Sequence, residues 1–173
     1  EGSMLVDEVS VIDENADFER KIREFIFNLT DDNPTFKAIE DKWKIEGEVS
    51  KAQRIIPFSS EKKWSGARLS DYSLIFGAPE YVLRESYKDF AEICEQAANK
   101  GQRVLVFAQA QADFNDRELP NEVSPVALIF ITDKIRDEAP QTLRFFKEQG
   151  VGIKIISGDN PVTVSAIAQK VGV

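Results

Sequence analysis

The chain has 173 residues, 42% of them hydrophobic and 30% charged, which is typical of a soluble globular protein with one sizeable core, or with one core and a small second lobe. A net charge of −8 argues against a nucleic-acid partner, because a phosphate backbone is bound by clustered Lys and Arg. A single cysteine and no histidine exclude an intrachain disulfide and remove the commonest zinc ligand.

Apolar residues recur at helical spacing over residues 16–30, which predicts an amphipathic helix capped by Asp17. A turn follows, and Pro34 can open a second short helix because proline suits the first helical position. Three β-prone runs come next and are expected to form an antiparallel sheet, over residues 51–58, 63–68 and 72–76.

Pro79 is expected to start a long helix that ends near Gly101, with that glycine just beyond the last turn. A β-prone run over residues 103–110 follows it. The polar stretch 111–122 is the best linker candidate, because composition and pattern both change after it. Strand and helix patterns then alternate, which indicates βαβ units with a parallel sheet, over residues 127–131, 137–149, 151–156 and 161–170.

The expected fold class is therefore α/β, or α+β. An antiparallel sheet flanked by helices is predicted over residues 11–122. A partial Rossmann-like βαβ segment is predicted over residues 123–173, to which residues 1–10 return. No apolar run approaches the roughly 20 residues needed to cross a bilayer, and the N-terminus has no signal-peptide pattern.

Two segments indicate phosphate chemistry. Ser157-Gly158-Asp159-Asn160-Pro161 follows an apolar run and offers a hydroxyl, a glycine and a carboxylate before a helix that Asn160 would cap. Backbone N–H groups at such a helix start attract anions. The run Phe58-Ser59-Ser60-Glu61-Lys62-Lys63-Trp64 adds an aromatic side chain and two lysines.

These segments resemble motifs of the P-type cation-transporting ATPases. Residues 157–161 are similar to the T-G-D-N-P motif of the phosphorylation domain in these pumps, and residues 133–136 to the D-P-x-R motif. Residues 58–63 resemble the F-S-x-x-x-K stretch of the nucleotide-binding domain, and residues 77–80 the end of K-G-A-P-E. Residues 1–4 resemble those that follow D-K-T-G-T-L-T. Order and spacing agree throughout, so the match is specific.

The resemblance implies a nucleotide-binding domain over residues 11–122 and part of a haloacid-dehalogenase-like phosphorylation domain over residues 1–10 and 123–173. It implies ATP and Mg²⁺ as cofactors and a cytoplasmic position in an integral membrane protein. The other phosphorylation, actuator and transmembrane parts of the same pump would be the partners. Details of the two nucleotide-binding motifs look most similar to a bacterial branch associated with divalent cations, calcium in particular.

The resemblance also assigns the residues that bind the nucleotide. Phe58 would stack on adenine, and a core phenylalanine is the alternative. Lys63 and Arg103 would contact the phosphates, with a solvated lysine and a surface ion pair as alternatives. Gly77 and Ala78 would let the backbone approach the ligand, although a simple strand-to-helix turn explains them nearly as well.

The resemblance assigns further roles to residues that fall at functional positions of the family. Thr35, with Asp32, falls where the family places polar groups near adenine, although helix capping also explains these residue types. The catalytic roles fall to Ser157, whose hydroxyl would help to bind the phosphoryl group, and to Asp159. Asp159 and Asp133 would lie near the ribose and phosphates, and ordinary helix capping is their alternative. No metal-ligating set is predicted.

The chain also departs from the family. Phe76 stands where K-G-A-P-E has lysine, which removes one positive charge and adds an apolar wall beside the base. The aspartate nucleophile of D-K-T-G-T is absent from the sequence, so we expect nucleotide binding without turnover. A missing first strand would leave the C-terminal lobe partly frayed.

Two alternatives stay open at this stage. The first is a catalytically silent regulatory or interaction domain that has lost ATP binding, which the missing lysine and the acidic charge favour. The second is a free-standing haloacid-dehalogenase-like phosphatase. That alternative lacks a D-x-D-x-T/V sequence near the start of the chain.

Overall fold

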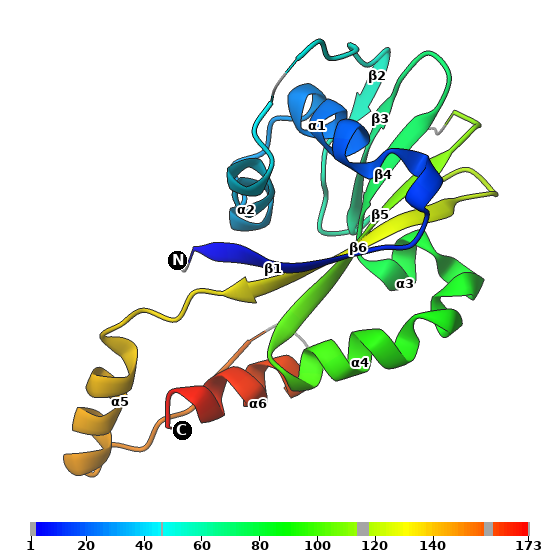
Figure 1. Ribbon diagram of the computed structural model, residues 1–173. Helices are drawn as coiled ribbons and strands as arrows, with labels where there is room; N and C mark the ends of the chain where they lie inside the picture. The colour runs from blue at the N-terminus through cyan, green and yellow to red at the C-terminus, as the bar shows by residue number, and fades with distance from the viewer. Residues whose placement is uncertain (1–2, 46, 114–117, 158–160, 173) are drawn as a thin grey trace.

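A six-stranded antiparallel sheet forms the centre of the computed structural model, which describes residues 3–45, 47–113, 118–157 and 161–172 (Figure 1). The strands are β1 (Met4–Val11), β2 (Arg54–Ile56), β3 (Trp64–Arg68), β4 (Ser73–Gly77), β5 (Gln102–Ala110) and β6 (Ser124–Asp133), in the spatial order β1-β6-β5-β4-β3-β2. The helices are α1 (Phe18–Asn28), α2 (Pro34–Lys42), α3 (Pro79–Val82), α4 (Ala91–Asn99), α5 (Ala139–Glu148) and α6 (Pro161–Lys170), with 3₁₀ turns η1 (Glu14–Ala16) and η2 (Arg84–Asp89). The predicted fold class, an antiparallel sheet flanked by helices, is confirmed.

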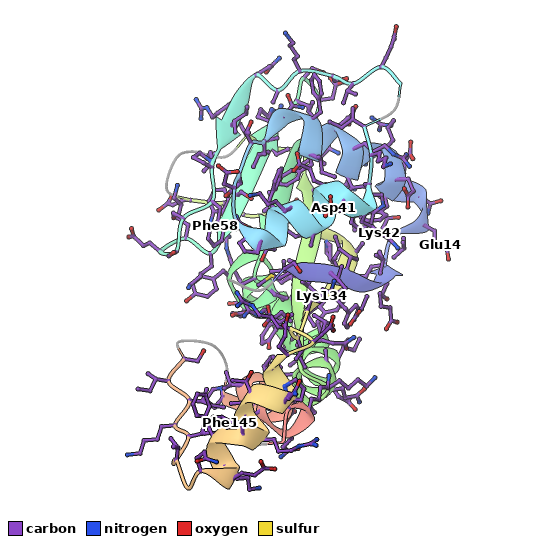
Figure 2. All side chains as sticks on the ribbon, turned by 90° about the vertical axis from the view of Figure 1, so that its left-hand side faces the viewer. Glu14, Asp41, Lys42, Phe58, Lys134 and Phe145 are labelled. Carbon is purple, nitrogen blue, oxygen red and sulfur yellow. The ribbon has the colours of Figure 1, made fainter. Side chains whose placement is uncertain are left out.

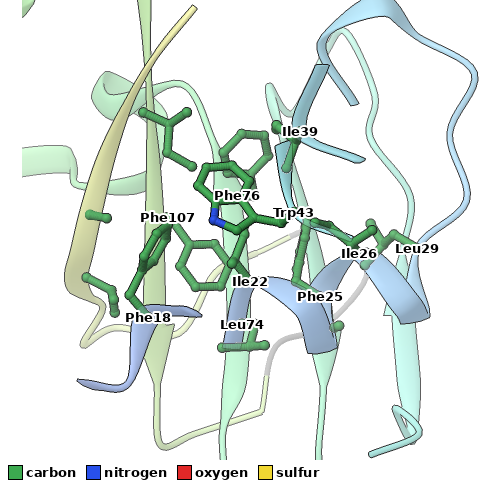
Figure 3. Packing of buried hydrophobic residues seen from close by; sticks show 14 of the residues in the cluster. Phe18, Ile22, Phe25, Ile26, Leu29, Ile39, Trp43, Leu74, Phe76 and Phe107 are labelled. Atoms are coloured by element: carbon green, nitrogen blue, oxygen red, sulfur yellow. The ribbon is translucent and has the colours of Figure 1, made fainter. Parts of the chain in front are cut away.

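Both faces of the sheet are covered, because successive residues of a strand point to opposite faces. On one face, α1 and α2 enclose an aromatic core in which the ring of Phe107 meets those of Phe18 and Phe25 edge to face, at centroid distances of 5.8 and 5.7 Å (Figure 3). On the other face, α3 and α4 cover a second core that includes Val106 and Phe130. Neighbours along β5 thus belong to different cores.

A buried polar network fixes α1 against the sheet. Glu24 is only 3% exposed, and its carboxylate accepts hydrogen bonds from the Tyr72 hydroxyl at 2.5 Å and from Arg20 at 2.8 Å. Burial, together with the bond to Glu24, raises the pKa of Tyr72. Burial likewise lowers the pKa of Lys21, whose ammonium donates to Gln109 on β5. Every buried charge of this network therefore has a partner, as burial of a charge demands.

Two predicted helices differ in detail from the structure. The expected cap of α1, Asp17, has a left-handed backbone with φ of 50° and makes no capping bond; its carboxylate accepts from Arg20 instead. The long helix expected from Pro79 to Gly101 is broken into α3, η2 and α4. Gly101 does follow the end of α4 with φ of 78°, so its predicted place is confirmed.

The prediction of a parallel sheet after residue 126 is wrong. β6 pairs antiparallel with β5 and with β1, and residues 151–157 form no strand. β1 therefore lies at the edge of the same sheet as β2–β5. The division of the chain into domains at residue 123 stays a prediction, although the sheet is continuous across it.

The segment beyond β6 lies apart from the sheet. No residue of α5 is buried, and Phe145 is 56% exposed (Figure 2). α6 lies beside α4, where the Lys170 ammonium donates to the carbonyl of Lys100 at 2.8 Å (Figure 1). No helix in the described parts of the chain combines the length and the apolar content that a membrane span requires.

Exposure of α5 leads to a first testable prediction. We expect its backbone amides to exchange with solvent at least about tenfold faster than those of β5, because few buried contacts oppose local opening. Hydrogen exchange followed by mass spectrometry measures this directly. Equal protection in α5 and β5 would contradict the predicted fraying of the C-terminal lobe.

Candidate functional site

A cavity of about 350 Å³ opens on the α1 and α2 face of the sheet. It lies between the start of α2, the loop that follows β2, and the neighbouring ends of β4, β5, β6 and β1. Most of the predicted cofactor-binding residues line it, namely Thr35, Phe58, Lys63, Gly77, Ala78 and Arg103. Its volume falls within the range of small-molecule sites. The structure thus brings together residues that are up to 68 positions apart, from Thr35 to Arg103.

The loop that carries Phe58 and Lys63 is held by backbone bonds. The Lys63 N–H donates to the carbonyl of Ser59 at 2.8 Å, and the Lys63 carbonyl accepts from the Ala78 N–H at 3.0 Å. Lys63 itself has a left-handed backbone with φ of 63°. Phe58 is 43% exposed beside the cavity, so the alternative of a core phenylalanine is wrong (Figure 2).

Gly77 is needed by the sheet itself. A Cβ atom at this position would lie 2.5 Å from the Lys63 carbonyl oxygen and 2.6 Å from the Trp64 Cβ. Such distances are far below ordinary contact, so no side chain fits between β4 and β3 here. The sequence assigned the glycine to close approach of a ligand, whereas the structure gives it a role in the approach of its own neighbouring strand.

The inner wall of the cavity is apolar. Phe76, only 6% exposed, lines the cavity, and its ring meets that of Phe25 at 5.8 Å. Leu105 and Ile131 lie in the same wall. The apolar wall expected from the replacement of lysine by Phe76 is therefore present in the structure.

Two cations reach the cavity from different elements. Lys63 comes from the loop before β3, and Arg103 from the start of β5. The Arg103 guanidinium donates from Nη2 to the Oδ2 atom of Asp133 at 3.3 Å, and the two side chains are 36% and 28% exposed. Asp133, which is absent from the cavity lining, thus meets the site through Arg103.

The start of α2 supplies polar groups that the sequence analysis missed. Asp31 and Asn33 line the cavity, and the Asn33 side chain caps α2 by accepting from the Phe36 N–H at 2.8 Å. The Thr35 hydroxyl donates to the Met4 sulfur at 3.2 Å. Asp32, which the sequence resemblance placed near adenine, does not line the cavity and pairs with Lys37 at 3.4 Å. The turn sequence could have given Asn33, since a residue before Pro at a helix start is a common cap.

The structure describes one of the two predicted catalytic residues, and that residue does not line this cavity. Ser157 is exposed and does not line it. Asp159 lies outside the described residues, together with Gly158 and Asn160. Their catalytic roles stay predictions.

Comparison with known proteins gives the class of the molecule. A family model described as haloacid dehalogenase-like hydrolase matches residues 10–173. The chain belongs to the haloacid dehalogenase-like hydrolases.

Several of its relatives are cation pumps by name. "Probable cation-transporting ATPase exp7" of Streptococcus pneumoniae is 40% identical over 152 residues, which cover 86% of this chain and 19% of that protein. "Calcium-transporting ATPase CtpE" of Mycobacterium tuberculosis is 38% identical over 117 residues, which cover 67% of this chain and 15% of that protein. The chain thus spans less than a fifth of the length of these relatives.

A solved structure shares the fold. The crystal structure of a zinc-transporting PIB-type ATPase in the E2.Pi state superposes with a TM-score of 0.62 at 18% identity, covering 98% of this chain and 26% of that one. The resemblance to P-type cation-transporting ATPases found in the sequence is confirmed by these matches.

Proposed function

We propose that this chain is the ATP-binding cytoplasmic portion of a P-type ATPase that couples ATP hydrolysis to cation transport across a membrane. The observation that carries the proposal is the cavity lined by Phe58, Lys63 and Arg103 together with the start of α2. An aromatic ring, an apolar wall and two cations in one cavity match the base and the phosphates of a nucleotide.

In this proposal the parts of ATP meet different walls. The exposed ring of Phe58 stacks on one face of adenine, since an aromatic π-face suits a planar base. Phe76 closes the apolar end of the cavity. Lys63 acts as a point charge on the phosphates, and the planar guanidinium of Arg103 can bind them with two hydrogen bonds.

Transfer of the γ-phosphate would take place on a part of the pump outside this chain. The sequence contains no D-K-T-G-T segment, so the aspartate that accepts the γ-phosphate belongs to another part of the pump, and this chain alone does not turn ATP over. Within the described residues, no group of three His, Cys, Asp or Glu side chains could hold a metal ion. Mg²⁺ is usually bound through one or two carboxylates together with substrate phosphates, so it would arrive with the phosphates of ATP.

We further propose a divalent cation, calcium in particular, as the transported ion. Support comes from the relatives named calcium-transporting ATPases. The remaining phosphorylation, actuator and transmembrane domains of the same pump would be the partners of this chain, and its place would be the cytoplasmic side of the cell membrane. Ser157 and Asp159 would act in the assembled pump.

A second candidate is a silent regulatory domain that no longer binds ATP. The observation in its favour is Phe76, which fills part of the cavity wall where the related motif carries a lysine. ATP binding separates the two candidates.

We expect Phe58→Ala to weaken ATP binding by about 5- to 150-fold, since stacking of a base on an aromatic ring contributes about 1–3 kcal/mol. Isothermal titration calorimetry of the purified chain with Mg-ATP measures the affinity. Ile55→Ala serves as the matched control, because Ile55 is 46% exposed on neighbouring β2 and does not line the cavity.

Wild-type chain that takes up no ATP at millimolar concentration would favour the silent domain. Saturable ATP binding that survives Phe58→Ala unchanged would place the nucleotide elsewhere and overturn the proposed site.

A further inference from the structure

The contact between Arg103 and Asp133 lies at the edge of a cavity whose proposed ligand is anionic. Both residues project from the same face of the sheet, because Arg103 pairs in register with Ile131 and Asp133 is two residues further along β6. Their ion pair measures 3.3 Å, longer than the roughly 2.7–2.9 Å typical of a strong charge-assisted bond. The Asp133 carboxylate thus accepts from a guanidinium nitrogen that a phosphate could also use, and the length of the contact indicates a weak bond.

A comparison of the two contacts favours a change of partner for Arg103, from Asp133 to a phosphate group. Ion pairs with both members partly exposed contribute little to stability, since water solvates the separated charges well. A phosphate group carries more charge and can accept two parallel hydrogen bonds from one guanidinium. Arg103 would therefore turn from Asp133 to the phosphates when a nucleotide enters the cavity.

We propose that Asp133 is an internal competitor for the phosphate groups, so that it lowers the affinity of the cavity for nucleotides while leaving the affinity for the nucleoside unchanged. This role is opposite in sign to the direct ligand contact that the sequence resemblance assigns to Asp133. It rests on the proposed function, because it presumes a nucleotide in this cavity.

The competition determines how much the phosphate groups add to the affinity of the cavity for a nucleotide. A nucleotide whose phosphates use Nη2 of Arg103 must displace Asp133 from that nitrogen, whereas adenosine makes no demand on Arg103. Asp133 also repels the phosphates directly, since like charges within a few ångströms oppose each other. Replacement of the carboxylate by its neutral amide removes the charge repulsion and weakens the competition, because an amide oxygen accepts from a guanidinium less strongly than a carboxylate does.

Calorimetric titration of the Asp133→Asn chain with ATP and with adenosine tests the proposal. ATP should bind about twofold to fivefold tighter than to wild type, in keeping with the loss of one partly exposed charge pair, and adenosine should bind equally well to both. Arg103→Ala should weaken ATP binding, and in the Arg103→Ala/Asp133→Asn double variant most of the gain should vanish. Melting temperatures of all variants show whether each is folded.

Asp7→Asn is the matched control for net charge. Asp7 accepts hydrogen bonds from Gln102 and Thr132, which neighbour Arg103 and Asp133 along their strands and so point to the opposite face of the sheet. Its replacement removes the same charge away from the cavity and should leave ATP affinity unchanged.

The inference would be overturned, with the proposed function intact, if Asp133→Asn binds ATP no tighter than wild type, if it gains equally for adenosine, or if Asp7→Asn gains as much. Absence of ATP binding in both wild type and Asp133→Asn would instead overturn the proposed function together with the inference. Weaker ATP binding by Asp133→Asn would also overturn the inference, and it would restore Asp133 as a direct ligand contact.

Discussion

Gly77→Ala is expected to lower the free energy of unfolding by about 3 kcal/mol, at the upper end of the usual cost of overpacking. The added methyl group would meet the Lys63 carbonyl oxygen, the Trp64 Cβ and the Trp64 Cα at distances of 2.5 to 2.7 Å, and none of these is the flexible end of a side chain. Strands β3 and β4 must separate locally to accept it. Equilibrium unfolding in urea measures the loss through the shift of the midpoint.

The same substitution should also weaken ATP binding, because Lys63 and Phe58 belong to the loop that would be displaced. Gly152→Ala is the control: a Cβ atom at Gly152 would meet no heavy atom within 4 Å, and the backbone there is not left-handed. Its stability should stay within about 0.5 kcal/mol of wild type. A Gly77→Ala chain as stable as the control would contradict the close approach of β3 and β4.

Phe107→Ala is expected to have the largest effect on folding, a loss of about 3–5 kcal/mol. Phe107 has no exposed surface and lies on β5, an inner strand of the sheet, with the rings of Phe18 and Phe25 packed edge to face on it. Truncation removes these contacts and leaves a cavity that the surrounding strands cannot easily fill. Thermal and urea unfolding should both register the loss.

Phe145→Ala makes the same chemical change on exposed α5 and should leave stability within about 0.5 kcal/mol of wild type. Comparable losses for the two variants would show that α5 is packed more firmly than the structure describes. A small loss for Phe107→Ala alone would contradict the aromatic core under α1 and α2.

Local sequence patterns predicted most elements of the N-terminal part because their apolar residues follow one clear period. The spacing of Phe18, Ile22 and Phe25 places one side of α1 in the core, and all three are buried. The short strands β3 and β4 likewise lie within one residue of their predicted ranges.

The error after residue 126 has a physical cause. β6 is buried on both faces, so its sequence is an uninterrupted apolar run, which is also the pattern of a strand in a parallel sheet. Pattern alone cannot distinguish the two arrangements. Pairing partners decide between them, and one of these, β1, lies more than 100 residues away in the sequence.

The break in the predicted long helix depends on tertiary contacts. Arg84 takes a left-handed backbone with φ of 53°, and its guanidinium donates to the carbonyl of Leu119 at 2.9 Å. No Pro or Gly lies between Pro79 and Gly101, so the sequence contains no residue there that would predict a break in the helix. A distant partner of this kind is invisible to any window on the sequence.

The residues of the candidate site likewise divide into those that the sequence predicted and those that it could not predict. Motif resemblance gave Phe58, Lys63, Gly77, Ala78, Arg103 and Thr35, and the structure places all of them around one cavity. It could not give Met4 or Asp31, because they reach the cavity only through the pairing of β1 with β6 and through the turn before α2. The binding roles themselves stay predictions until nucleotide is titrated.

Met4 has a practical consequence of its own. It is the only methionine of the chain, it lines the cavity, and its sulfur accepts the Thr35 hydroxyl. Growth on methionine labelled with ¹³C at its methyl group would therefore give a methyl resonance from the cavity wall. Its shift during titration would report occupancy of the cavity without a dye, a tag or an added reporter residue.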